Sequence, residues 1–238
     1  YKTNFPSFFK KIFDYRDSRS FAAKFRARRI ALFMSMIKDL PKPVKILDIG
    51  GLEGLWERTG MAGDAAYSIT LLNLEPIQPR YKNIQYLFGD ATNMPQFGEA
   101  EFDVVFSNSV IEHVGDYANQ LKMGREVRRV GKRYFIQTPN RHFPIEPHFF
   151  VPFFQFFSLP FKVWLIQNFN LGWFRKTPDV DKALEIANSV KLLTRREFQA
   201  IFPQAEIYNE NFFIFTKSFI AFKRDNPSGN SVELSERI

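Results

Sequence analysis

The sequence of 238 residues contains no cysteine. Disulfide bonds and thiolate metal sites are therefore excluded, and we expect a reducing, intracellular setting. Histidine is almost as scarce, because His113, His142 and His148 are the three in the chain. Their scattered positions do not match the ligand spacing of structural zinc sites, so we predict no metal site.

The sequence also lacks a long apolar run. Its longest nearly uncharged stretch extends from Pro147 to Phe161, is interrupted by Pro152 and Pro160, and ends at Lys162. A membrane-spanning helix requires about 20 apolar residues in succession. Charged residues near the beginning of the sequence are atypical of a secretory signal. We therefore expect a cytoplasmic protein that is not an integral membrane protein.

Acidic residues are few in the first part of the sequence. Residues 1–45 contain twelve Lys or Arg but three Asp, and the whole chain has a net charge of +8. Such a bias suits an acidic partner, which could be nucleic acid, an anionic membrane surface or a phosphorylated substrate, but it also suits a solvated helix face. Apolar positions at helical spacing predict a helix over residues 18–40, which Pro41 and Pro43 end.

Strand-like and helix-like segments alternate after this helix. Long apolar runs separated by helices predict an α/β fold in which a parallel sheet is covered on both faces. Near the end of the chain, Thr194 and Glu197 form a capping-box pattern that predicts a helix over 194–202. The predicted strands are 44–49, 67–75, 84–89, 102–108, 132–139, 205–213 and 216–223, and the other predicted helices are 52–61 and 117–130.

Phenylalanine is unusually abundant, with 29 residues in the chain. Residues 140–176 hold many of them, mixed with Trp and Pro. Two interpretations stay open. The segment could form a cap of paired helices that packs on the sheet. It could instead wall a pocket for an aromatic or lipid-like acceptor, or lie on a membrane surface.

Polar residues follow four successive predicted strands. In a doubly wound sheet, ligands bind beyond the carboxyl ends of the strands. Glycines there let a ligand approach the backbone, and acids after the second and third strands can accept hydrogen bonds from ribose hydroxyls and an adenine amino group. Glu53, near the start of the following helix, disfavours a phosphate at that position. The sequence therefore predicts a cofactor that contains adenosine and carries no phosphate.

Five motifs in this order resemble the class I S-adenosylmethionine-dependent methyltransferases, in particular their small-molecule "type 11" group. The motifs are "ILDIGGLEG" (46–54), "NLEP" (73–76), "GDATNMP" (89–95), "FDVVFSNSVIEHVGD" (102–116) and "YFIQTPNRHFPIEPHF" (134–149). Residues 192–222 also resemble the ending of that group, so the resemblance spans about 44–222. It implies a Rossmann-like, doubly wound sheet of seven mostly parallel strands with an antiparallel last strand, here with a Phe-rich helical cap after the fifth strand.

The resemblance implies a single methyltransferase domain over residues 1–224. Within it we expect an N-terminal basic helical region (1–43), a cofactor-binding core (44–139), an aromatic cap (140–190) and a C-terminal helix with strands (191–224). Residues 225–238 are polar and broken by Pro and Gly, so we expect a disordered tail there.

The resemblance also implies S-adenosyl-L-methionine as cofactor and S-adenosyl-L-homocysteine as product. The matching positions are Asp48, Gly50, Gly51, Gly54, Asn73, Glu75, Asp90, Ala91, Ser107 and Asn108. The loop after the first strand would surround the methionine part and the ribose, Glu75 (or Asn73) would hold the ribose hydroxyls, and Asp90 would contact adenine. Residues 107 and 108 would approach the methionine amino group. The pair Gly51–Leu52 departs from the family, which has a variable residue and then glycine, so the contacts of this loop stay open.

The implied reaction is a direct, in-line displacement at a sulfonium methyl group by a nucleophile of the acceptor. We expect O- or N-methylation of a small or amphipathic acceptor, with the protein orienting the reactants and excluding water. A nucleophile that carries a proton needs a base. Candidates are His113, His142, Glu146 and His148, of which we predict His113, His148 and Glu146 as catalytic.

Two other classes of function stay open. A nucleic-acid methyltransferase would suit the isoelectric point of about 9.6, but residues 107–110, "SNSV", lack the Asn/Asp-Pro-Pro-aromatic element that grips a flipped base. We therefore do not expect nucleic acid as a partner. A non-catalytic relative would bind the cofactor without transferring its methyl group. The expected partner is a small-molecule or lipid-like acceptor, with peripheral membrane contact as a further prediction.

Overall fold

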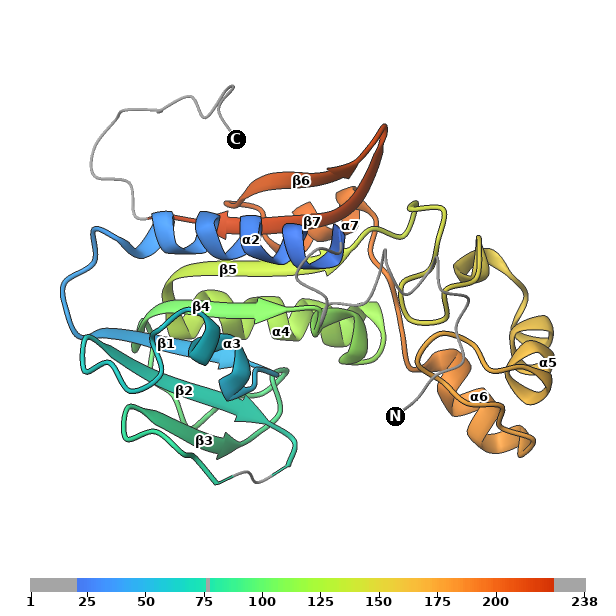
Figure 1. Cartoon of the computed structure of the whole chain (residues 1–238), viewed down its shortest axis with the longest axis horizontal. Coiled ribbons are helices and arrows are strands. Elements are labelled where there is room, and N and C mark those ends of the chain that lie inside the picture. Colours follow the sequence, from blue (N-terminus) through green and yellow to red (C-terminus); the bar gives the residue numbers. More distant parts are fainter. Residues whose placement is uncertain (1–20, 76–77, 225–238) are drawn as a thin grey trace.

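The computed structural model describes residues 21–75 and 78–224. The basic segment before residue 21 and the expected disordered tail at 225–238 lie outside the described residues. Seven strands of the described part form one sheet in the order β3-β2-β1-β4-β5-β7-β6 (Figure 1). The strands are β1 (Val44–Ile49), β2 (Tyr67–Asn73), β3 (Ile84–Phe88), β4 (Phe102–Asn108), β5 (Gly131–Pro139), β6 (Glu206–Phe212) and β7 (Phe215–Lys223).

The first five strands pair in parallel, whereas β7 is antiparallel to both β5 and β6. This arrangement confirms the predicted Rossmann-like sheet, with an antiparallel last strand. The central strands are long apolar runs because helices cover them on both sides. The helices are α2 (Phe21–Ile37), α3 (Glu53–Arg58), α4 (Tyr117–Val130), α5 (Leu159–Asn168), α6 (Val180–Asn188) and α7 (Arg195–Ile201), and the 3-10 turns are η1 (Ile111–His113) and η2 (Phe154–Phe156).

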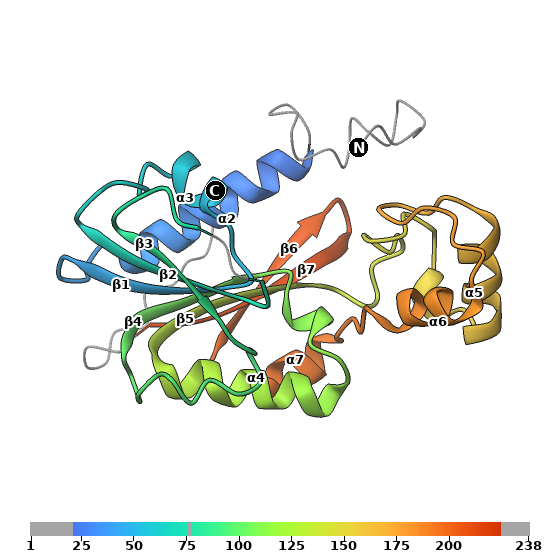
Figure 2. The ribbon, with the colours of Figure 1, turned by 90° about the horizontal axis from the view of Figure 1, so that it is seen from below.

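Helices cover both faces of the sheet (Figure 2), and each face has its own apolar core. On one face, Phe33 of α2 and Trp56 of α3 pack edge-on against Phe106 of β4. On the other face, Met123 of α4 and Phe198 of α7 are fully buried. Burial of these large side chains is the main stabilising contribution to the fold.

Helix α2 is fastened to the sheet by two buried arginines. The Arg133 guanidinium of β5 donates to the Met36 carbonyl at 2.7 Å and to Asp39 Oδ1 at 2.7 Å, just beyond the helix end. Arg29, in the helix, donates from Nε to Glu210 Oε1 of β6 at 2.7 Å. The basic bias of this region is therefore used in part to bind the helix to the sheet, and is not confined to a solvated face.

The predicted ends of the regular elements agree closely with the structure, apart from three. The helix predicted over residues 18–40 ends at Ile37. The helix predicted over 52–61 is shorter, because α3 ends before Thr59 and Gly60. The strand predicted to reach residue 75 ends at Asn73. The capping box at α7 is confirmed, since Thr194 Oγ1 accepts from the Glu197 amide at 3.2 Å and the Glu197 carboxylate accepts from the Thr194 amide at 2.8 Å.

The Phe-rich segment forms its own small unit beyond the carboxyl ends of the strands (Figures 1 and 2). Helices α5 and α6 pair there, as in the first of the two interpretations of this segment. They do not pack on a sheet face, however, because their buried residues form a separate core. That core consists of Phe149, Phe154, Val163, Ile166, Leu171, Ala183 and Ala187. Across the described ranges, no helix has the length and apolar character needed to cross a membrane.

Candidate functional site

The carboxyl ends of β1, β2, β3 and β4 lie along one edge of the sheet, and the strand order reverses between β1 and β4. This switch point is where doubly wound sheets bind ligands. Backbone bonds order the loops there: the Gly50 amide donates to the Leu72 carbonyl at 2.8 Å, and the Gly89 amide donates to the Asn73 carbonyl at 3.0 Å. The Asn73 side chain also donates to the Gly51 carbonyl at 2.8 Å. Asn73 therefore orders the loop after β1, which leaves Glu75 as the acid beyond β2.

Asp48 lies beneath this loop. Its side chain is fully buried and accepts a hydrogen bond from Trp56 Nε1 at 2.8 Å. The loop passes so closely that a Cβ atom at Gly51 would lie 1.7 Å from Asp48 Oδ2. The carboxyl group supports the loop from inside the protein. By contrast, a Cβ atom at Gly54 would meet only Arg58 Nη1, at 3.5 Å.

Burial raises the pKa of Asp48 from its usual 3.8 to about 8, although the Trp56 hydrogen bond opposes this effect. The folded protein therefore keeps a proton that the unfolded chain releases above pH 4. Between pH 4 and 8 the free energy of unfolding should fall as pH rises, by at most about 1.4 kcal/mol per pH unit. Urea unfolding at several pH values should show this slope flattened in Asp48→Asn and retained in Asp181→Asn, an exposed control on α6. Parallel curves for the wild type and Asp48→Asn would contradict the prediction.

Two acids stand exposed beyond β2 and β3. Glu75 is solvent-accessible, as is Asp90, whose carboxylate accepts from the amide and the hydroxyl of Thr92, both at 2.8 Å. Ala91 is buried in the core, so only its backbone can face a ligand. Glu53 is also buried and accepts from the Arg80 amide and from Arg80 Nε, both at 2.7 Å. The Arg80 guanidinium neutralises the charge of Glu53. The expected repulsion between Glu53 and a phosphate is therefore weakened.

Large apolar side chains are exposed among these polar groups. Leu52 is 58% exposed, and Leu74 and Phe88 are each 71% exposed. They lie at the carboxyl ends of three neighbouring strands, β1, β2 and β3. Exposed apolar residues grouped at strand ends are typical of a ligand-binding surface. Flat apolar rings are the ligand groups that suit this surface.

The residues at the end of β4 point into the protein. Ser107 is buried and donates to the Ile49 carbonyl at 3.3 Å. Asn108 Oδ1 accepts from Arg29 Nη1 at 2.6 Å. These side chains are already hydrogen-bonded, so a ligand at this strand end meets mainly backbone. Ser109 follows with φ of 57°, a left-handed conformation that redirects the chain toward η1.

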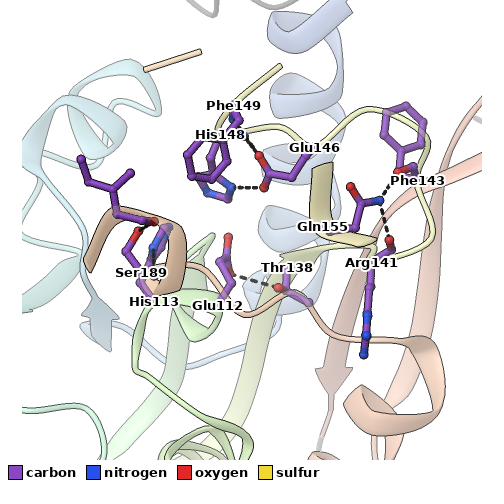
Figure 3. Close-up of polar contacts among 11 residues, drawn as sticks. Glu112, His113, Thr138, Arg141, Phe143, Glu146, His148, Phe149, Gln155 and Ser189 are labelled. Carbon is purple, nitrogen blue, oxygen red and sulfur yellow. Dashed lines mark hydrogen bonds and ion pairs between the residues drawn. The ribbon is translucent and has the colours of Figure 1, made fainter. Parts of the chain in front are cut away.

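A second polar cluster lies beyond the ends of β4 and β5 (Figure 3). We call it the histidine cluster; its members are Glu112 and His113 of η1, and Glu146 and His148 of the loop after β5. The rings of His113 and His148 meet edge to face, with centroids 4.8 Å apart. His148 Nδ1 lies 2.7 Å from Glu146 Oε1, and the other Glu146 oxygen accepts from the amides of His148 and Phe149.

The cap holds His148 in place. The Trp173 amide donates to the His148 carbonyl at 3.0 Å. Gly172, which has φ of +53°, comes so close that a Cβ atom there would lie 1.9 Å from the same oxygen. Two packing constraints from a distant loop therefore fix the backbone that carries the imidazole.

Burial and neighbouring charges shift the pKa values of Glu112 and His148 for different reasons. Burial raises the pKa of Glu112, even though the nearby histidines and Thr138 oppose it. Burial alone would lower the pKa of His148, but the hydrogen bond and negative charge of Glu146 and the charge of Glu112 outweigh it and raise that pKa. His142 is not part of this cluster, because its ring stacks on Phe156 at a centroid distance of 6.3 Å.

A pocket of about 440 Å³ lies between the cap and the start of α4. Glu146 of the histidine cluster forms part of its wall, together with the aromatic rings of Tyr117, Phe149, Phe154 and Phe157. Three cationic residues also line it, namely Arg141, Lys162 and Lys191. Burial and the charges of Lys191 and Arg141 lower the pKa of Lys162, although Glu146 opposes them. The carboxylates of Asp116 and Glu197 line it as well, so the pocket suits a ligand with an apolar body and a polar end.

Comparisons with known proteins agree with this fold. Residues 61–134 match the sequence family described as "Methyltransferase domain". The chain is similar to the CurJ carbon methyltransferase, with 13% identity, a TM-score of 0.55, and coverage of 87% of this chain and 55% of that one.

Two further structures are similar. One is a proposed sarcosine dimethylglycine methyltransferase from Galdieria sulphuraria (23% identity, TM-score 0.39, covering 51% of this chain and 47% of that one). The other is the YcgJ protein from Bacillus subtilis (16% identity, TM-score 0.48, covering 78% and 71%). The chain thus spans about half the length of the CurJ and Galdieria proteins. The likeness to CurJ is one of fold.

Proposed function

Since residues 61–134 match the methyltransferase domain family, we propose that the chain is a class I S-adenosylmethionine-dependent methyltransferase of the type 11 group. It would methylate a hydroxyl or amine of a small or amphipathic acceptor. The proposal rests on one observation: the loop after β1 and the histidine cluster lie side by side at the carboxyl ends of the strands. The loop after β1 offers a cofactor cradle, and the histidine cluster lies next to it. Val110, just before η1, links the two, because its side chain packs directly over Gly50.

The residues present fit the cofactor. Gly51 lies close to Asp48 and has no side chain. A ligand on the solvent side of the loop would therefore meet backbone atoms at this position. Glu75 and Asp90 present exposed carboxylates at neighbouring strand ends, which suit ribose hydroxyls and an adenine amino group. Leu52, Leu74 and Phe88 would cover the flat faces of the base. When bound, S-adenosylmethionine supplies an electrophilic methyl group on a positively charged sulfur.

We propose that the other residues around the loop also take part in cofactor binding. Gly50, Gly54 and Asn73 would shape the loop, and the backbones of Ala91, Ser107 and Asn108 would border the ligand. Asp48 would act from below, by holding the loop in position, and not by direct contact.

The acceptor would enter from the cap. The aromatic pocket between cap and α4 reaches Glu146, so an acceptor seated there has its polar end directed to the histidine cluster. The chain's residues orient this group, exclude water and receive its proton if it carries one. His113, His148 and Glu146 are the groups that would accept that proton.

An amphipathic or lipid-like acceptor is favoured by the outer surface of the cap. Phe153, Phe156, Phe161, Trp164, Phe169 and Trp173 are all between 44% and 53% exposed. A monomeric protein rarely exposes that many aromatic rings on one small unit. Such a surface suits an acceptor with a long apolar part, and peripheral contact with a membrane stays a prediction.

Calorimetric titration with S-adenosylmethionine tests the cofactor site. We expect Asp90→Ala to weaken binding by about 10-fold or more, because a carboxylate hydrogen bond to the ligand is worth roughly 1.5–3 kcal/mol. Glu75→Gln should weaken it less, since the amide keeps one acceptor. Asp181→Ala, an exposed acid of α6, is the matched control and should bind normally.

Undiminished binding by both Asp90→Ala and Glu75→Gln would show that the cradle is misplaced. Formation of S-adenosylhomocysteine with a panel of phenols, amines and amphipathic alcohols then tests transfer. Tight cofactor binding without transfer to any of them would favour the non-catalytic alternative.

A further inference from the structure

Three side chains of the histidine cluster are arranged as metal ligands. We infer that Glu112, His113 and His148 bind a divalent transition-metal cation. One candidate ligand atom from each lies within 4.8 Å of those of the other two. The inference deepens the proposed function and rests on it, because the cluster is the acceptor side of the same site. It also revises our expectation from the sequence that no metal site exists.

Glu112 gives the first reason. Its side chain is completely buried, and Oε2 accepts from Thr138 Oγ1 at 3.0 Å. Its other oxygen, Oε1, is buried without a hydrogen-bond partner among the described residues. A buried carboxylate oxygen left unpaired is costly, and native proteins pair such atoms with a donor or a cation. A cation beside His113 and His148 would satisfy it.

The two histidines give the second reason. His148 Nδ1 is bonded to Glu146, and His113 Nδ1 lies 3.2 Å from the Ser189 carbonyl oxygen. Each ring therefore has Nε2 left for a ligand. Metal-binding histidines are held in this way, with one ring nitrogen on a carboxylate or a backbone carbonyl and the other on the ion. Glu146 is thus a positioning residue that orients His148.

The donor set indicates the kind of ion. Two imidazoles and one carboxylate suit Zn²⁺, Fe²⁺ or Mn²⁺ better than Ca²⁺ or Mg²⁺, which prefer oxygen ligands. Around a tetrahedral ion with bonds of about 2.1 Å, ligand atoms lie about 3.4 Å apart. The largest separation in the cluster would therefore shorten by up to about 1.4 Å on binding. His113 is exposed, so its ring can make this movement without disturbing the core.

A cation held by three protein ligands keeps a position open for another oxygen. An acceptor hydroxyl bound there would be oriented by the ion and would release its proton to water more readily. His113 and His148 would then act as ligands, and the ion would take over the activation of the acceptor. The pocket between the cap and α4, whose wall includes Glu146, would hold the remainder of the acceptor.

The test uses the full chain, freed of metal with a chelator. Zn²⁺ is titrated by calorimetry, and Co²⁺ is added separately to record the absorption bands of a nitrogen-coordinated ion. We expect saturable binding by the wild type. His148→Ala should weaken Zn²⁺ binding by about 100-fold or more, and Glu112→Gln and Glu146→Gln by about 10- to 100-fold. His142→Ala, which changes the one histidine outside the cluster, is the control and should bind as the wild type does.

Binding of S-adenosylmethionine is measured on the same variants to show that each is folded. If Zn²⁺ binding is absent from the wild type, or is lost equally in His142→Ala, the metal site is wrong. Zn²⁺ binding that depends on the cluster but is not accompanied by cofactor binding would instead contradict the proposed function. Methyl transfer that survives complete metal removal would refute the activating role of the ion.

Discussion

Alanine at position 51 should weaken S-adenosylmethionine binding by about 100-fold or more. The new Cβ atom would lie 1.7 Å from Asp48 Oδ2 and 2.0 Å from Asp48 Cγ, far inside the distance at which atoms repel. Asp48 cannot turn aside easily, because it is buried and bonded to Trp56. The loop must therefore move outward, into the space that we assign to the cofactor.

Calorimetric titration of Gly51→Ala measures this loss. Gly98→Ala is the matched control, because a Cβ atom at that exposed glycine would meet nothing closer than Glu101 Oε2 at 3.7 Å. Adding Asp48→Ala to Gly51→Ala removes the carboxyl group that clashes, so the double variant should recover part of the affinity. Wild-type affinity in Gly51→Ala alone would mean that the loop does not contact the cofactor.

Removal of the Arg29 guanidinium should destabilise the whole fold. Arg29→Met leaves the Glu210 carboxylate, which is 3% exposed, without its ion pair. Breaking one partner of a buried ion pair costs about 3–5 kcal/mol. The pKa of Lys217 is lowered to about 8 by burial and by the charge of Arg29. Without Arg29 this lysine keeps its proton more readily and compensates Glu210 in part, so we expect the lower end of that range.

Urea unfolding of Arg29→Met gives the change in free energy. The exposed neighbour Arg28→Met should change it by less than about 0.5 kcal/mol. The double variant Arg29→Met/Glu210→Met removes both charges and should be more stable than Arg29→Met alone. Equal stability of Arg29→Met and Arg28→Met would rule out the ion pair as an anchor of α2.

The parallel strands and α4 could be predicted from the sequence because each is a continuous local pattern. Residues 102–108 and 117–130 contain their own periodicity and boundaries, so neighbouring residues suffice to locate β4 and α4. The order of polar residues after these strands likewise predicts a ligand site at the carboxyl ends of the strands, since parallel strands end at the same edge of the sheet.

The sequence could not show which of those polar side chains are exposed. Asp48 and Glu75 both follow the family pattern, yet one is buried under the loop and the other is open to solvent. Burial depends on contacts that form only when the chain folds, such as that of Trp56 with Asp48, eight residues away, and that of Arg80 with Glu53, 27 residues away. The sequence likewise does not show that Arg80 pairs with Glu53 and reduces its repulsion of a phosphate.

The histidine cluster was only partly predictable. The sequence points to His113, Glu146 and His148 because they follow strand ends, but it does not single out Glu112. No local pattern reveals that one Glu112 oxygen is buried without a hydrogen-bond partner among the residues that the structure describes. The approach of His148 to His113 depends on an irregular loop in which Phe150 and Phe153 have positive φ. Such conformations leave no periodic pattern in a sequence.

The contacts between the cap and His148 imply thermodynamic linkage between binding in the cap pocket and binding at the histidine cluster. Trp173 and Gly172 hold the backbone of His148, and Glu146, on the wall of the cap pocket, holds its imidazole. A molecule that settles in the pocket and shifts the cap must therefore change the affinity of the histidine cluster for its own ligand. By reciprocity, occupation of the cluster must change the affinity of the pocket by the same factor.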